Sequence, residues 1–123
     1  MFVRSAAVFL LSCQILCAQE AWSPLDAVNA KRAKKGLKSL VMDNRLMSMA
    51  KKVSSKRASI NVRGHLPGWQ AGHAKSEGVG WDSSRDLEGK RFRSCCLYGK
   101  KWRYAGVGIS VSKHGTFYTL MVR

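Results

Sequence analysis

The chain is poor in acidic residues. Seven aspartates and glutamates stand against 22 lysines and arginines in 123 residues, which gives a formal net charge of +15 at pH 7. A charge of this size bears on partners and solubility, because it attracts anionic surfaces such as the cell envelope and lipid headgroups. It predicts no sequence-specific recognition of nucleic acid. The simpler alternative is that most of the charge forms a solvated face.

Long apolar runs are also missing. A helix that spans a bilayer needs about 20 apolar residues, whereas the apolar stretch near the N-terminus covers only Ala6–Leu11. This stretch follows Arg4 and is followed by a small residue, Ala18, an order that is typical of a secretory signal peptide. We therefore expect residues 1–18 to be cleaved and residues 19–123 to be secreted or periplasmic.

A second processing route is open. The string Leu10-Leu11-Ser12-Cys13 has the apolar-apolar-small-Cys order of a bacterial lipoprotein signal, which would leave a lipidated Cys13 at the new N-terminus. Either route exports the protein. The remaining chain is long enough for a single domain but not for two.

Cysteines beyond the signal are limited to one adjacent pair, Cys95 and Cys96. Two neighbours cannot link distant segments, so the fold must depend on its hydrophobic core. Exported proteins meet an oxidising environment, and three states are open: a vicinal disulfide, an intermolecular bridge, or free thiols packed as small hydrophobic groups. No Cys-x-x-Cys spacing for a metal occurs.

Common enzyme motifs are absent too. The sequence has no nucleophile elbow, no phosphate-binding glycine loop and no His-Glu-x-x-His. Composition alone leaves Ser–His–acid and Cys–His catalysis open, but no local pattern supports either. We expect no enzymatic activity, although the sequence does not decide the question.

Two helices are predicted in the first half of the chain. The string Ser23-Pro24-Leu25-Asp26 is a capping-box arrangement with proline at the first helical position, and Gly36 is a natural stop. Asp43 can cap a second helix with an apolar stripe at helical spacing and a basic opposite face. The stripe comprises Leu46, Met49, Ala50 and Val53; the basic face comprises Lys51, Lys52, Lys56 and Arg57.

The second half predicts a loop, a short helix and a hairpin. Residues 64–80 contain five glycines and Pro67, and so favour a long irregular segment. A short helix is expected within residues 84–97. Alternating apolar residues over 104–111 and a β-rich run over 116–122 flank a glycine-containing turn, which predicts an antiparallel hairpin. The fold class is therefore α+β.

Four stretches carry a resemblance when taken in order. They are Leu25–Leu37, with an Asn before a basic residue and a Gly-Leu end; Leu40–Leu46 with Ala50; Glu77–Trp81; and Tyr104–Ser110. Together they resemble the CAP superfamily, the SCP-like domains of cysteine-rich secretory, pathogenesis-related and short bacterial exported proteins. The resemblance implies a compact alpha-beta-alpha sandwich with two N-terminal helices, a long loop, a short helix and a C-terminal hairpin.

The resemblance also implies a site. Members often carry two histidines and two glutamates that face a central cleft, where some bind a divalent metal. Glu77 matches the motif glutamate, and His65 is the best candidate for the first histidine. Where the second histidine is usual, this chain has Gly89-Lys90-Arg91 or Arg93. Glu88 is the only nearby carboxylate that could act as the second glutamate.

Three interpretations of this cluster stay open. His65, His73 and Glu77 could supply three ligands to a divalent metal such as zinc, which takes three or four protein ligands. Alternatively, the histidines are exposed loop residues and Glu77 pairs with a cation, or a polar cleft persists without metal. The tryptophans Trp22, Trp69, Trp81 and Trp102 either fill the core or stack on sugars or bases, and Trp69 is the one expected to be exposed.

We therefore expect an exported CAP-like binding module, non-enzymatic, that engages a ligand or an anionic envelope component. One alternative is a metal-dependent hydrolase that uses the histidine and glutamate cluster. Another is a cationic, envelope-active protein whose charge is its function. The ligand and the oligomeric state cannot be read from the sequence.

Overall fold

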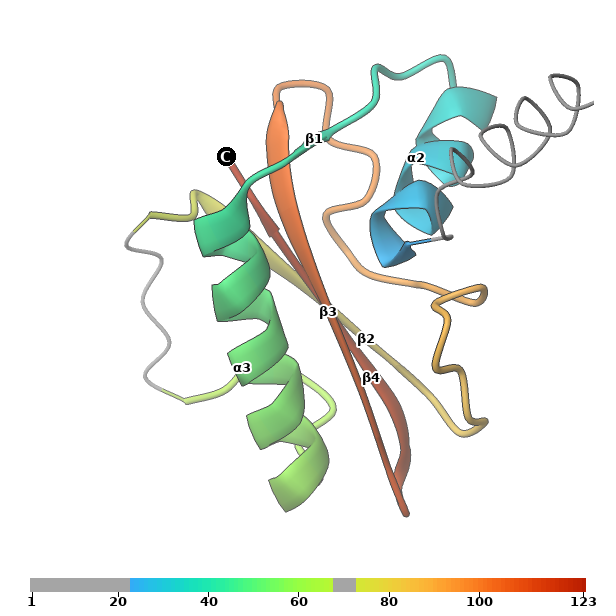
Figure 1. Cartoon of the computed structure of the whole chain (residues 1–123), viewed down its shortest axis with the longest axis vertical. Coiled ribbons are helices and arrows are strands. Elements are labelled where there is room, and N and C mark those ends of the chain that lie inside the picture. The colour runs from blue at the N-terminus through green and yellow to red at the C-terminus, as the bar shows by residue number, and fades with distance from the viewer. Residues whose placement is uncertain (1–22, 68–72) are drawn as a thin grey trace, which may run out of the picture.

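A computed structural model describes residues 23–67 and 73–123. The predicted signal peptide, Cys13, Trp22 and Trp69 lie outside the described residues. Two helices and a four-stranded mixed sheet form an α+β fold within the described residues (Figure 1). Neither of these two helices is long and apolar enough to cross a bilayer.

The first described helix, α2, spans Pro24–Lys34 and begins as its sequence predicts. The Ser23 hydroxyl accepts a hydrogen bond from the Asp26 backbone N–H, and the Asp26 carboxylate accepts one from the Ser23 N–H at 2.8 Å. This reciprocal pair satisfies two donors at the start of the helix. The chain leaves the helix through Gly36, whose φ of 70° lies in the left-handed region.

The second helix, α3, spans Asn44–Ile60, and its predicted cap is confirmed. One Asp43 carboxylate oxygen accepts from the backbone N–H groups of Arg45 and Leu46 at 2.9 and 3.0 Å. The predicted stripe faces inward, with two residues fully buried and two partly buried. The expectation for Arg57 was wrong: its side chain is completely buried instead of lying on the basic face.

The predicted C-terminal hairpin is confirmed. Strands β3 (Tyr104–Ser112) and β4 (Gly115–Val122) pair antiparallel and close at Ser112 opposite Gly115, which has a φ of 121°. Strand β1 (Val41–Met42) pairs parallel to β3 at one edge, and β2 (Ser76–Asp82) pairs antiparallel to β4 at the other. The sheet order is therefore β1-β3-β4-β2.

Two expectations for the middle of the chain need correction. The segment predicted as a loop over 64–80 ends in strand β2. Gly78 and Gly80 alternate along this strand, and both pack closely on residues 93–96. The short helix expected within 84–97 is replaced by turns. There the Asp86 carboxylate accepts from the backbone N–H groups of Lys90 and Arg91 and from the Tyr118 hydroxyl, contacts that a sequence pattern does not reveal.

The two helices cover opposite faces of the sheet (Figure 1). On the α2 side, Val28 packs with Val107, Tyr118 and Leu120 in the larger core cluster. On the α3 side, the core cluster comprises Leu46, Ala50, Ala74 and Met121. The backbone of α3 sits directly on β3 at Gly106 and Gly108, where an added Cβ would collide with helix backbone atoms. Small residues at these points set the distance between helix and sheet.

This close approach predicts the effect of a single methyl group. We expect Gly106→Ala to lower the free energy of unfolding by about 1–3 kcal/mol, because the added carbon overlaps the backbone of Leu46 and Met47. The control is Gly64→Ala, where no atom lies within 4 Å of an added Cβ and we expect a change within about 0.5 kcal/mol. Urea denaturation measures both, and equal stabilities would contradict the described packing.

Candidate functional site

Glu77 and His65 form a pair on the α3 side of the sheet, in which Glu77 is buried and His65 is exposed. Glu77 comes from β2 and its side chain is 1% exposed, whereas His65 follows α3 and its side chain is 53% exposed. Nδ1 of His65 lies 2.5 Å from Oε1 of Glu77. The carboxylate therefore fixes the orientation of the imidazole ring, whose Nε2 has no hydrogen bond within the described residues.

The second carboxylate oxygen of Glu77 is unusual. Oε2 is buried and has no hydrogen-bond partner among residues 23–67 and 73–123. A buried carboxylate oxygen without a donor costs free energy. Because Glu77 is enclosed and the His65 side chain is 53% exposed, His65 Nε2 is the polar atom of this pair that a ligand can reach.

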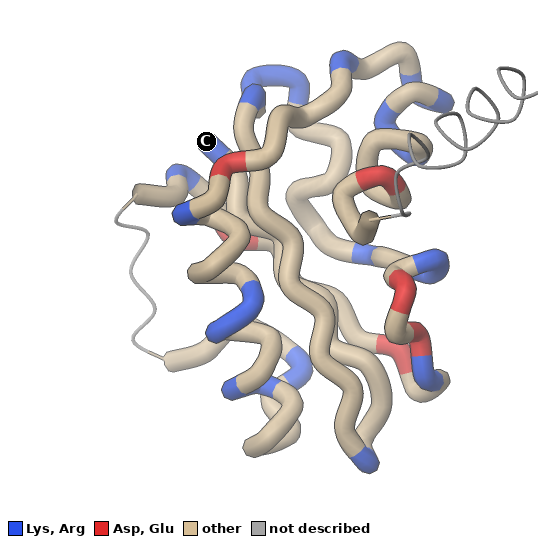
Figure 2. The backbone as a smooth tube through the Cα atoms, in the orientation of Figure 1, with Lys and Arg blue, Asp and Glu red and all other residues tan. Residues whose placement is uncertain are grey.

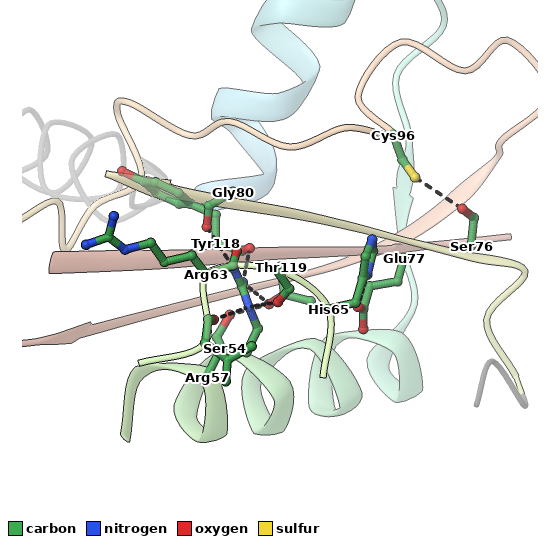
Figure 3. A network of polar contacts seen from close by, with 12 residues as sticks. Ser54, Arg57, Arg63, His65, Ser76, Glu77, Gly80, Cys96, Tyr118 and Thr119 are labelled. Carbon is green, nitrogen blue, oxygen red and sulfur yellow. Dashed lines mark hydrogen bonds and ion pairs between the residues drawn. The ribbon is translucent and has the colours of Figure 1, made fainter. Parts of the chain in front are cut away.

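Arg57 lies beside this pair, between α3 and the sheet (Figure 3). It is a cation with no carboxylate partner in the described part of the chain, yet its donors are satisfied by six oxygen atoms at 2.5–3.2 Å. The acceptors are the carbonyls of Val62, Arg63, Gly64, Gly80 and Tyr118, and the Thr119 hydroxyl. Burial lowers the pKa of Arg57, and the negative charge of Glu77 acts in the opposite direction.

These bonds position His65. Three of the acceptors of Arg57 are carbonyls of residues 62–64, immediately before His65 in the chain. Two others belong to β2 and β4, the strands beside Glu77. One guanidinium therefore ties the segment that carries His65 to the strands that carry and flank Glu77.

His73 lies apart from this pair. Its Nε2 is 3.1 Å from Oδ2 of Asp43, the residue that caps α3, and Arg123 Nε contacts the same oxygen at 3.3 Å. The structure thus brings together His65 and Glu77 but not His73 with them. Glu88 is exposed, pairs with Lys90 at 3.1 Å, and belongs to the segment that packs on the α2 side.

A metal site needs three or four converging ligands. The described residues contain no group of three or more His, Cys, Asp or Glu side chains that could hold a metal ion. The residues present therefore do not fit a divalent cation, and we derive no chemical step that passes through one.

Ser76 and Cys96 occupy the other face of β2. Their side-chain oxygen and sulfur lie 3.1 Å apart, and Figure 3 shows them across the strand from His65 and Glu77. Both Cys95 and Cys96 are free thiols in this structure. Burial raises the pKa of Cys96, which favours the neutral thiol. Neither Ser76 nor Cys96 is placed as a nucleophile next to His65.

Arg57 and Asp43 are the site residues whose roles sequence reasoning missed. Asp43 was recognised as a helix cap but not as the partner of His73. For Arg57 a signal did exist, because it falls four residues after Val53 and seven after Ala50, on the buried stripe of α3. The sequence interpretation assigned Arg57 to the basic face because of its charge, although its position lies on the apolar stripe.

Removal of the Arg57 side chain is expected to unfold the site along with much of the domain. Arg57→Ala leaves several buried carbonyls without donors, so we expect a loss of at least about 3 kcal/mol in the free energy of unfolding. Lys56→Ala, an exposed neighbour on the same helix, is expected to change it by less than about 0.5 kcal/mol. Chemical denaturation followed by circular dichroism compares the two, and a similar small effect of both would contradict this account.

The lowered pKa of Asp43 predicts that the stability of the fold depends on pH. The Leu46 backbone N–H, followed by His73, lowers the pKa of Asp43 from 3.8 to about 2 in the folded chain. The ionised carboxylate therefore stabilises the fold above pH 3.8, and this contribution is lost as the pH falls toward about 2. We expect Asp43→Asn to be less stable than the wild type at neutral pH and to converge with it near pH 2. The urea unfolding midpoints of both proteins, measured from neutral pH to about pH 2, test this expectation. A difference between the two midpoints that stays constant with pH would contradict it.

No protein-family model matches the chain, and no curated protein matches it.

Proposed function

We propose that this chain is an exported, non-enzymatic binding module of the CAP (SCP-like) type, which engages an anionic component of the cell envelope. The observation that carries the proposal is the distribution of charge in the fold. Most described carboxylates are engaged within the fold, whereas the described lysines and arginines are exposed apart from the buried Arg32 and Arg57 and the half-buried Lys31. Figure 2 shows the positions of the lysines and arginines along both helices and the loops.

The described carboxylates are almost all engaged within the fold. Asp26 and Asp43 cap the helices, and Asp82 and Asp86 accept backbone N–H groups in the turns after β2. Glu77 is buried with His65. In contrast, only three lysine or arginine side chains form ion pairs in the described segments: Lys90, Arg93 and Arg123. The surface is thus left with an excess of unpaired cations, which favours binding to polyanions.

The arrangement of the elements supports the CAP-like fold. One helix lies on each face of the sheet, in keeping with an alpha-beta-alpha sandwich, and the two residues matched to the family cleft, His65 and Glu77, come together although they are separated in sequence. Half of the family's usual site is not matched, because Gly89-Lys90-Arg91 or Arg93 stands where the second histidine is usual and the exposed Glu88 pairs with Lys90. This partial site favours ligand binding over catalysis.

The pair itself suits a polar ligand at the surface. His65 Nε2 would bond a polar atom of the ligand while the buried Glu77 carboxylate holds the imidazole ring in place. The basic surface would hold the protein at the envelope, and the pair would recognise a polar group there.

The test compares anionic and neutral probes. We expect the protein to bind polygalacturonate, polyphosphate or phosphatidylglycerol vesicles and not dextran or phosphatidylcholine vesicles, with an affinity that falls as salt is raised. Binding is expected to be the same in EDTA, and the polymers are expected to keep their length. Isothermal titration calorimetry and size-exclusion chromatography provide the two readouts.

The competing functions give different results in the same experiment. A metal-dependent hydrolase would shorten a polymer and lose activity in EDTA. Equal affinity for charged and neutral probes, or no binding to any anionic probe, would overturn the proposal.

A further inference from the structure

A groove lies at the β1 edge of the sheet and is lined by the link that joins α2 to β1 and by the segment that precedes β3. Figure 1 shows the course of these two segments. Its volume is about 590 Å³. Because β1 and β2 are opposite edges of the sheet, this groove is distinct from the His65–Glu77 pair on β2. The residues that line it include three cations and two aromatic side chains: Lys38, Lys100, Arg103, Trp102 and Tyr104.

The lining cations are free to meet an anion. Lys38, Lys100 and Arg103 are exposed, and none of them forms an ion pair within the described residues. The groove lining contains no carboxylate. Asp43, the acidic residue nearest in sequence, is already engaged by His73 and Arg123. The groove is therefore uniformly positive.

A buried arginine ties together the backbone segments of the groove. Arg32 of α2 is 1% exposed and donates to the carbonyls of Lys38, Leu97 and Gly99, each at 2.9 Å. These carbonyls belong to the two chain segments that form the opposite walls. The lysines and the arginine of the groove thus project from a cross-linked backbone, which reduces the entropy lost when a ligand binds.

Each aromatic ring of the groove has a cation over one of its faces. Lys101 Nζ lies 4.6 Å from the centroid of the Trp102 ring, and the Arg123 guanidinium lies 5.0 Å from that of Tyr104. Nucleobases bind single-strand proteins by stacking on open aromatic faces, so these covered rings do not favour nucleic acid. A flat lipid surface does not enter a groove, whereas a single extended chain does.

We propose that this groove binds an anionic polysaccharide whose sugar units carry carboxylates, a polyuronate. The inference rests on the proposed function, which places the protein at the cell envelope, and it names the ligand class and the surface. Arg103 can bind a carboxylate with two parallel hydrogen bonds, and the lysines add charge along the chain. The apolar rim formed by Leu37 and Val41 packs against the C–H groups of the sugar rings.

The experiment uses two variants of the full chain with the same loss of charge. In the groove variant, Lys38, Lys100 and Arg103 are each replaced by Gln; in the control, Lys51, Lys52 and Lys56 on the exposed face of α3 are replaced by Gln. All six side chains are exposed, so both variants are expected to fold, which thermal denaturation verifies. The probe is a short oligogalacturonate, titrated by calorimetry at low salt.

We expect the groove variant to bind the oligogalacturonate at least about tenfold more weakly than the wild type, and the control variant less than about threefold more weakly. Backbone amide shifts on titration are expected to cluster in residues 36–41 and 100–104. Equal losses in both variants, or shifts spread over α3, would overturn the groove and leave general charge attraction as the mode of binding.

The failure of this inference is distinguishable from that of the proposed function. If the wild type binds polyphosphate or phosphatidylglycerol vesicles but not oligogalacturonate, the polyuronate site is wrong and the envelope function stands. Tighter binding of polyglutamate or single-stranded DNA than of oligogalacturonate, lost in the groove variant, would reassign the groove to another class of polymer. Absence of binding to every anionic probe would overturn both.

Discussion

Burying a cation in a protein core costs free energy unless its donors are satisfied, and the core on the α3 side meets this condition by surrounding Arg57 with backbone carbonyls and one hydroxyl. These acceptors come from the segment that follows α3, from β2 and from β4. The same bonds that stabilise the charge therefore hold His65 over Glu77. In this sense the candidate site is a consequence of how one guanidinium is buried.

The α2 side repeats this solution. Arg32 is also buried, and it bonds only backbone carbonyls, which belong to the two segments that form the basic groove. Each helix thus contributes one internal arginine that ties loops to the sheet. Because neither arginine uses a carboxylate, the scarce acidic side chains stay available as helix caps and turn anchors, and the fold is built without neutralising its surface. The excess of exposed cations follows from this division.

The sequence predicted the parts of the fold that depend on local interactions. The capping box at Ser23, the cap at Asp43 and the alternating strands of the hairpin involve residues a few positions apart, so their patterns are readable. It also singled out Glu77 and His65 as members of one site, through resemblance to a family, and the structure places them in contact. Its prediction of a loop over residues 64–80 was wrong for the part that forms β2, because glycines that serve close packing look the same in sequence as glycines that serve flexibility.

By itself, then, the sequence determined where the two helices begin, the hairpin and the strong positive charge, since these follow from local hydrogen bonding and composition. Only the tertiary structure decided which charged side chains are buried, and on which face each candidate residue lies. His73 binds Asp43, Ser76 faces away from His65, and Arg57 is internal because strands distant in sequence supply its acceptors. Such partners are brought together by the packing of the sheet, and no spacing along the chain encodes them.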